Sequence, residues 1–296
     1  MSMSFRVAAF PMILMTALSA CVGGGGSGER GSVVREVPFT SFSAVGPNET
    51  VVMSGVSQTG SGTDSAFNLD PVNETGSTAK LTYDANRNLS GIGISTPRSS
   101  VSFGAGETGC TTTGGCAAGN ATSQAALVDP AFFGWNYQSF GVWMNHISST
   151  SFQAGALSAG AVTPASALPT GLTDASFTGH ASGFYFDAAG NRFATDAQMS
   201  AVTDFKNRNI QFSTTGTLLT DTSTFARTDR PTLDLTGNWS YAPGTSQFSG
   251  AVDTQDGALT GNASGRFYGP NAQEIGGVYG LTGGGASMLG GFGGKR

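Results

Sequence analysis

Residues 265–281 read GRFYGPNAQEIGGVYGL, a stretch that combines aromatic strand residues, a tight turn and paired glycines. The turn lies at 268–272, where proline and asparagine suit a reversal of the chain between two strands. We expect the carboxylate of Glu274 to cap the backbone of this turn. Gly276 and Gly277 lack side chains, so the second strand can lie close to a neighbour. The stretch therefore predicts a β-hairpin with a structural role.

Alternating strands and turns extend outward from this hairpin over the second half of the chain. In 209–219 the residues Ile210, Phe212 and Leu218 share one face, which indicates a strand with one buried side. Short hairpins make neighbouring strands antiparallel, and eight of them can close into an up-and-down barrel filled by side chains. We count eight strand candidates, at 135–146, 177–187, 198–206, 209–219, 232–241, 246–253, 258–268 and 274–282.

Composition favours the same fold class. Of 296 residues, 45 are glycine and only 11% are charged. Glycine costs roughly 1 kcal/mol at a helix-interior site, so a helical protein is disfavoured. The 20 phenylalanines disfavour a disordered chain. A formal net charge of −5 and the lack of a basic stripe give nucleic-acid binding no support. We therefore expect an all-β protein that binds no nucleic acid.

The first part of the body is predicted to form its own β-rich domain. Residues 32–104 hold short apolar or alternating runs broken by turn signals. Residues 105–126 then shift to glycine, threonine, alanine and asparagine, which marks a domain boundary or a long loop. We therefore expect a β-rich domain at 32–126, followed by an eight-stranded antiparallel barrel at 127–296.

The amino terminus has the pattern of an export signal. Residues 1–20 carry one arginine and a short apolar run, too short for a membrane span. The sequence Leu-Ser-Ala-Cys that ends at Cys21 resembles a bacterial lipobox, so we expect lipidation of Cys21 and a partner in the lipid bilayer. Residues 21–31 are glycine-rich and predict a flexible tether. The alternative is a plain secretory signal with a coincidental cysteine.

The other two cysteines lie close together, in GCTTTGGC at 109–116. Zinc sites usually need four ligands at tighter paired spacing, and no histidine or third cysteine lies nearby. In an exported protein the pair Cys110 and Cys116 therefore predicts a small disulfide loop in the β-rich domain, with two free thiols as the alternative.

Residues 265–281 resemble the last hairpin of the transferrin-binding protein B-like barrel family. The closing GGFGGKR at 290–296 is similar to the usual carboxyl end of that family. Weaker similarities lie at 135–143, 177–183 and 202–205. The resemblance implies an eight-stranded barrel, and it implies that 32–126 is the handle domain that precedes such a barrel.

The same resemblance implies a surface or outer-membrane lipoprotein that binds a ligand. It implies a role in iron or haem acquisition, with an extracellular protein or a haem-type molecule as the ligand. An outer-membrane transporter is a further expected partner. The largest members of the family have two lobes and bind host transferrin, whereas this chain holds one predicted barrel.

Catalysis finds no support in the sequence. The two histidines, His146 and His180, have no nucleophile or acid at a defining spacing, and no zinc-binding pair is present. His146 either offers an axial haem ligand or simply ends a strand. Asp253 and Asp256 fit turn chemistry better than calcium binding. We therefore expect no enzyme, no cofactor and no metal site.

Candidate ligand-binding segments are few. The long stretch 147–176 and the glycine-rich stretch 105–126 are the loops where we would expect a partner to bind. The aromatic cluster at 132–135, FFGW, is either core between the domains or an exposed patch. Two other functions stay open: a structural or adhesive envelope lipoprotein, and a periplasmic carrier of a small apolar molecule inside the barrel.

Overall fold

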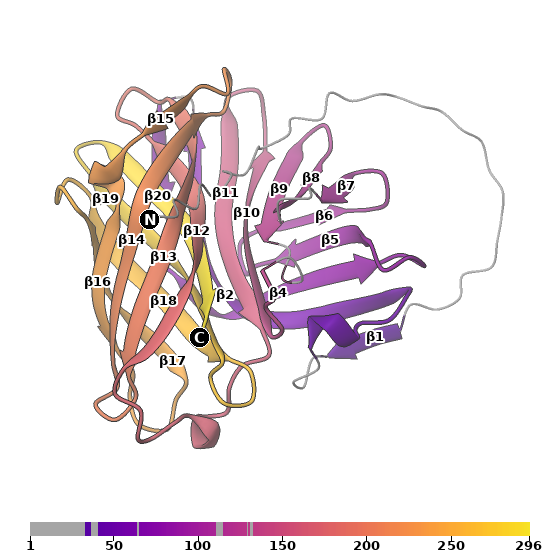
Figure 1. Ribbon diagram of the computed structural model, residues 1–296. Coiled ribbons are helices and arrows are strands. Elements are labelled where there is room, and N and C mark those ends of the chain that lie inside the picture. Colours follow the sequence, from indigo (N-terminus) through magenta and orange to yellow (C-terminus); the bar gives the residue numbers. More distant parts are fainter. Residues whose placement is uncertain (1–32, 37–40, 64, 111–114, 129, 131–132) are drawn as a thin grey trace, which may run out of the picture.

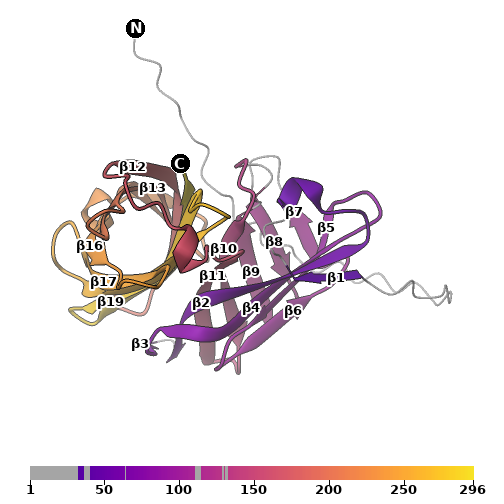
Figure 2. The same ribbon diagram turned by 90° about the horizontal axis from the view of Figure 1, so that it is seen from below.

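The computed structural model describes residues 33–36, 41–63, 65–110, 115–128, 130 and 133–296. The predicted signal at 1–20 and the whole tether at 21–31, Cys21 included, lie outside these residues. Two β bodies lie side by side: an open, curved sheet and a closed barrel (Figures 1 and 2). Within the described residues, the structure contains no helix with the length and apolar character that crossing a membrane would require.

The open sheet, which we call the handle sheet, has the strand order β6-β5-β4-β2-β11-β10-β9-β8-β7. Strands β1 and β3 also pair with β2, and β1 does so in parallel, whereas the other pairs are antiparallel. Its strands are β1 (Val33–Glu36), β2 (Glu49–Thr63), β3 (Ala66–Leu69), β4 (Asn73–Tyr83), β5 (Leu89–Ser95), β6 (Ser100–Phe103), β7 (Thr108–Cys110), β8 (Gly115–Gly119), β9 (Ser123–Val128), β10 (Gln138–His146) and β11 (Ser151–Gly160).

The barrel closes because β12 pairs with β13 on one side and with β20 on the other. Its eight main strands are antiparallel, which confirms the predicted all-β class and the barrel type. They are β12 (Ala175–Phe186), β13 (Arg192–Asp204), β14 (Asn209–Asp221), β16 (Leu235–Ser240), β17 (Gln247–Thr254), β18 (Thr260–Tyr268), β19 (Glu274–Gly283) and β20 (Ala286–Lys295). The short β15 (Arg227–Asp229) pairs with β14. The described part of the chain also contains three short 3-10 helices, η1 (Phe42–Ala44), η2 (Ala165–Ala167) and η3 (Pro231–Leu233).

Two of the expected strand assignments need correction. The candidate at 135–146 is a strand, but as β10 it pairs with β9 and β11 in the handle sheet. The eighth barrel strand is instead β20 at the carboxyl end. The handle sheet therefore continues to Gly160 and the barrel sheet begins at Ala175, whereas we expected the division between 126 and 127.

The stretch 147–176 is likewise no long loop, because it contains β11, which pairs with β10 over nine residues and with β2 over ten. Its sequence, SFQAGALSAG, is poor in the bulky residues that indicate a strand. The sequence of β20 is rich in glycine and is likewise poor in the bulky residues that indicate a strand. A Cβ atom on Gly290 would collide with the ring of Tyr279, so the strand needs glycine at this close approach.

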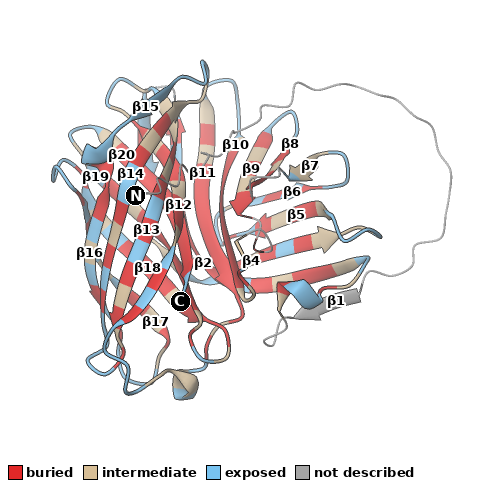
Figure 3. Ribbon diagram, in the orientation of Figure 1, coloured by how far each residue is buried: buried red, intermediate tan, exposed pale blue. Residues whose placement is uncertain are grey.

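Aromatic side chains fill the barrel. The rings of Phe212 and Trp239 lie 4.4 Å apart, and those of Trp239 and Phe248 lie 5.5 Å apart. Phe292 from β20 reaches the same cluster, with its ring 4.9 Å from that of Phe212. Figure 3 shows buried positions alternating with exposed ones along the barrel strands. The interior is therefore a packed core.

A second apolar cluster joins the barrel to the handle sheet. Phe67 and Phe152 from the handle sheet pack with Phe186 from the barrel, and the rings of Phe67 and Phe186 are 4.0 Å apart. Val278 and Leu289 belong to this cluster too, and both are fully buried. Because these side chains lie on the outer face of the barrel, the two bodies share one continuous apolar seam.

At the lower end of this seam, Glu274 of the barrel binds the backbone of the segment that enters β10. Its carboxylate accepts hydrogen bonds from the backbone N–H of Asn136 at 2.6 Å and of Tyr137 at 3.0 Å. The side chain is 1% exposed, and burial raises its pKa to about 7 against the effect of these backbone hydrogen bonds. Our expectation that Glu274 caps its own turn is therefore wrong, because it caps the segment that enters β10.

The paired glycines of the motif also serve this contact. A Cβ atom on Gly276 would collide with the side chain of Gln138 and would lie 2.7 Å from Ser158 Oγ. The amide of Gln138 donates to the carbonyl of Ile275 at 3.0 Å. The missing side chain therefore lets the handle sheet approach the barrel wall closely.

We predict that Glu274→Ala lowers the free energy of unfolding by about 2–5 kcal/mol, because two buried backbone N–H groups lose their acceptor. Urea denaturation followed by circular dichroism measures the change. Glu107→Ala is the matched control, since Glu107 accepts one backbone hydrogen bond, from Gly104, at an exposed turn. A loss of similar size in both variants would contradict the proposed role of the Glu274 carboxylate in joining the barrel to the handle sheet.

Candidate functional site

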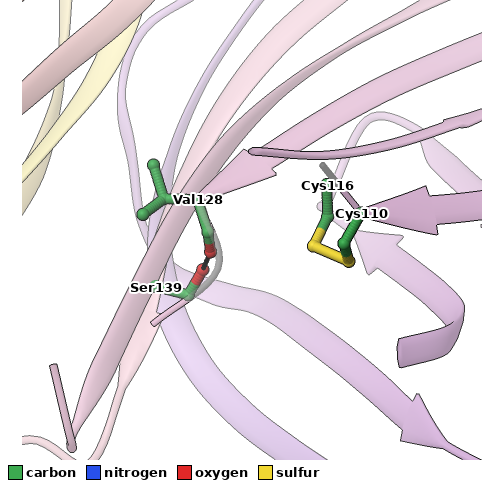
Figure 4. The surroundings of a disulfide bond; sticks show 4 residues. All are labelled: Cys110, Cys116, Val128 and Ser139. Atoms are coloured by element: carbon green, nitrogen blue, oxygen red, sulfur yellow. Dashed lines mark hydrogen bonds between the residues drawn. A yellow bond between two sulfur atoms is a disulfide. The ribbon is translucent and has the colours of Figure 1, made fainter. Parts of the chain in front are cut away.

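The cysteine pair predicted in the first domain lies in the hairpin of β7 and β8. Cys110 and Cys116 are register partners there, and their sulfur atoms are bonded. Figure 4 shows the bond close to the point where Ser139 Oγ donates to the carbonyl of Val128, at 2.9 Å. Cys116 is buried and Cys110 is exposed, so the bond links the surface of the hairpin to the handle sheet. The predicted loop at 105–126 is thus largely strand.

The two histidines lie in different bodies, so they form no common site. His146 ends β10 at an exposed position. His180 lies in β12, where its ring packs 4.6 Å from that of Phe133 and burial lowers its pKa. Within the described residues, no group of three or more His, Cys, Asp or Glu side chains could hold a metal ion.

The aromatic cluster before β10 is part of the core, as far as the structure describes it. Trp135 is 3% exposed and packs between Phe133 and Phe140, with ring distances of 5.4 Å and 6.0 Å. Phe132 lies outside the described residues. The described part of this cluster therefore offers no exposed aromatic patch.

Among the described residues, two of the three large exposed apolar side chains lie at one end of the molecule, which we call the loop end, and the third, Leu172, lies at the opposite end. The loop end consists of the β10–β11 turn at 147–150 and the β14–β15 turn at 222–226. Ile147 is 60% exposed and Phe225 is 44% exposed. Figure 3 shows these turns as exposed segments at the same end of both bodies. Single exposed apolar side chains are common on protein surfaces, so it is their place at the same end that makes these two a candidate contact surface.

A chain of contacts connects the two turns of the loop end. Phe152, next to the first turn, packs under the guanidinium of Arg192, which lies 4.1 Å from the ring centre. The carbonyl of Arg192 accepts hydrogen bonds from the backbone N–H and the hydroxyl of Thr222, both at 3.1 Å. Arg192 thus links the strand that follows the first turn to the start of the second turn.

Phe225 sits in an unfavourable backbone conformation. Its φ is 60°, in the left-handed region that bulky residues avoid. Asp221 holds the turn, since its carboxylate accepts hydrogen bonds from the backbone N–H groups of Ser223 and Thr224. These bonds and that of the Ser223 hydroxyl lower the pKa of Asp221 to about 2. A strained aromatic residue on a rigid exposed turn indicates a functional constraint.

Neither Ile147 nor Phe225 stood out in the sequence. Each is a single bulky apolar residue in a run of serine and threonine, HISSTS at 146–151 and DTSTFART at 221–228. A single bulky apolar residue among polar ones is the sequence signal that could have identified these two positions. This signal indicates a binding site only when the fold places the two runs in turns at the same end of the molecule.

The fold and the loop end define a lobe in which a filled barrel and a β-sheet handle together present apolar side chains on fixed turns. Residues 168–296 match the family model described as the C-lobe and N-lobe beta barrels of Tf-binding protein B. The matched residues hold the barrel, which is therefore similar to the barrels of the transferrin-binding protein B family.

Solved structures of that kind are similar to the chain. One is transferrin-binding protein B of Haemophilus parasuis Hp5, with 16% identity and a TM-score of 0.44, covering 81% of this chain and 45% of that chain. Another is the N-lobe domain of lactoferrin-binding protein B of Moraxella bovis, with 10% identity and a TM-score of 0.41, covering 81% and 98%. This chain thus spans less than half of the first protein. No curated protein matches the sequence significantly.

We predict that Phe225→Asn raises the free energy of unfolding by about 1 kcal/mol, because asparagine tolerates the left-handed conformation and the ring is exposed. Urea denaturation tests this. Arg208→Asn should give a similar gain, since Arg208 has a φ of 59° in a turn at the opposite end of the barrel. A loss of stability in Phe225→Asn would show that the ring is needed for folding.

Asp196 on the outer face of β13 gives a prediction of pH dependence. Burial raises its pKa to about 6, so the folded protein keeps this proton between pH 4 and pH 6 while the unfolded chain loses it. The wild type should therefore lose stability relative to Asp196→Asn as the pH rises from 4 to 7, by up to about 3 kcal/mol. Urea denaturation at four pH values measures the difference. Asp253→Asn, at an exposed position, should show no such trend.

Proposed function

We propose that this protein is a lipid-anchored lipoprotein of the outer membrane that binds an iron-carrying protein outside the cell. Ile147 and Phe225 of the loop end make the contact with that partner. The single observation that carries the proposal is the pairing of a filled barrel with apolar side chains on fixed turns. Because side chains occupy the barrel interior, the ligand must bind on the outside of the lobe.

The family of the barrel supports this reading of the loop end. Similar solved structures carry the names transferrin-binding and lactoferrin-binding protein, and both names refer to iron-carrying proteins as ligands. The lipobox at Cys21 and the glycine-rich tether at 21–31 support an anchored position on the cell surface. An outer-membrane transporter would then take over the iron. Catalysis, a cofactor and nucleic acid have no part in this function.

The filled interior also decides against one alternative function. A carrier of a small apolar molecule needs a cavity inside the barrel, but Phe177, Phe248, Phe267 and Phe292 are each at most 1% exposed within it. A structural or adhesive envelope lipoprotein remains the competing proposal, and the experiments below distinguish it.

Protease treatment of intact cells tests the cell-surface position. We expect external protease to remove the barrel while a periplasmic control protein survives. Protection of the barrel in intact cells, with digestion after lysis, would contradict surface binding.

The variant Cys21→Ser in the full chain should release the protein from the membrane fraction, because the acyl chains then have no attachment point.

Binding is tested with the purified mature chain and two probes, iron-loaded transferrin and iron-loaded lactoferrin. We expect saturable binding of at least one probe and a loss of tenfold or more in the double variant Ile147→Ser/Phe225→Asn. Leu172→Ser is the matched control, because Leu172 is 45% exposed at the opposite end. Arg208→Asn controls for the change in stability. No binding of either probe, or equal binding by the double variant and the controls, would favour the structural role.

A further inference from the structure

A groove separate from the residues of the loop end lies in the seam between the two bodies. Strands β8, β9 and β10 form its handle wall, and β12, β13 and β14 form its barrel wall. Its cavity volume is about 60 Å3, and the groove is partly open to solvent. Most of its lining is apolar, including Ala126, Val128, Phe140, Val142, Phe184 and Ala194.

Asp196 is the one charged residue among the described residues that line this groove. It lies opposite Ser182 in the β12–β13 pairing, and Ser182 Oγ donates to its carboxylate at 3.3 Å. Burial raises its pKa to about 6, while the hydrogen bond from Ser182 and the attraction of Arg227 compensate only in part. The fold therefore keeps a poorly solvated carboxylate at an apolar surface, which is costly without a positive partner.

We propose that this groove binds a small ligand that carries one cationic amine on an apolar chain. The chain lies along the apolar walls, and the ammonium group donates hydrogen bonds to the Asp196 carboxylate. Charge complementarity selects the amine, because an ammonium ion both neutralises the carboxylate and satisfies its free acceptor sites. A fatty acid of the same length would bring a second negative charge to the same place.

The seam gives the groove a defined shape. Val142 from the handle sheet and Phe184 from the barrel are both buried members of the apolar cluster that joins the two bodies. The packing of this cluster therefore holds one wall of the groove against the other. Ala126 and Ala194 are only partly buried, so their small side chains leave the space that an apolar chain would occupy.

The test is isothermal titration of the purified mature chain at pH 7.5 with octylamine, octan-1-ol and octanoate, below the concentrations at which they form micelles. We expect saturable octylamine binding that is tenfold or more weaker in Asp196→Asn. Octan-1-ol should bind both proteins within twofold, since it uses only the walls. Octanoate should bind more tightly to Asp196→Asn than to the wild type.

Matched variants separate the groove from general surface binding. Asp253→Asn, which changes an exposed aspartate on β17, should leave octylamine affinity unchanged. Ala126→Phe should fill the groove and weaken octylamine and octan-1-ol alike by tenfold or more. Ala251→Phe places the same ring at an exposed position of β17 and should weaken neither.

Three results would overturn the proposal. They are no saturable octylamine binding by the wild type, equal affinity in Asp196→Asn and Asp253→Asn, and unchanged affinity in Ala126→Phe. Circular dichroism shows whether each variant is folded, and Asp196→Asn should be at least as stable as the wild type at pH 7.5. The proposed protein binding at the loop end does not depend on this groove, so either proposal can fail alone.

Discussion

The contact between the Glu274 carboxylate and two backbone N–H groups is the interaction on which the arrangement of the two bodies depends. It fixes the segment that enters β10. The same motif also fixes the segment that leaves β11, since Thr163 donates from its N–H to the carbonyl of Phe267 and from its hydroxyl to the carbonyl of Gly269. The segments that enter and leave the β10–β11 pair lie side by side at one end of it, and both are therefore attached to one barrel hairpin. These hydrogen bonds and the apolar seam together set the orientation of the handle sheet.

A fixed orientation matters because the barrel has no room for a ligand of its own. Recognition then has to use surfaces, and surfaces recognise well when their turns are rigid. The chain stiffens its turns with one repeated device, an aspartate whose carboxylate accepts hydrogen bonds from backbone N–H groups a few residues later. The device recurs at Asp84, Asp187, Asp204, Asp221 and Asp256. It explains how a protein with few charges still holds its turns in place.

Much of the fold could be predicted from the sequence, because period-two patterns and turn residues report buried faces and chain reversals. They do not report which strands are neighbours, so 135–146 was expected in the barrel although β10 lies in the handle sheet. The strands β11 and β20 were not expected, because small residues in β11 and glycines in β20 replace most of the bulky residues that indicate a strand. The loop end could not be predicted, because Ile147 and Phe225 are 78 residues apart in sequence. Their turns come to the same end of the molecule only through the fold, in which Phe152 packs against Arg192.

The pairing of β12 with β20 has a consequence for how the molecule forms. These are the first and the last barrel strands along the chain, and Thr178 pairs with Lys295. Closure must wait until all strands between them are made, and contacts so distant in sequence form slowly. Until then β12 and β19 each keep an open edge that could pair with another chain. An incomplete molecule is therefore the aggregation-prone state of this protein, and the glycine-rich β20 is the strand that ends this vulnerability.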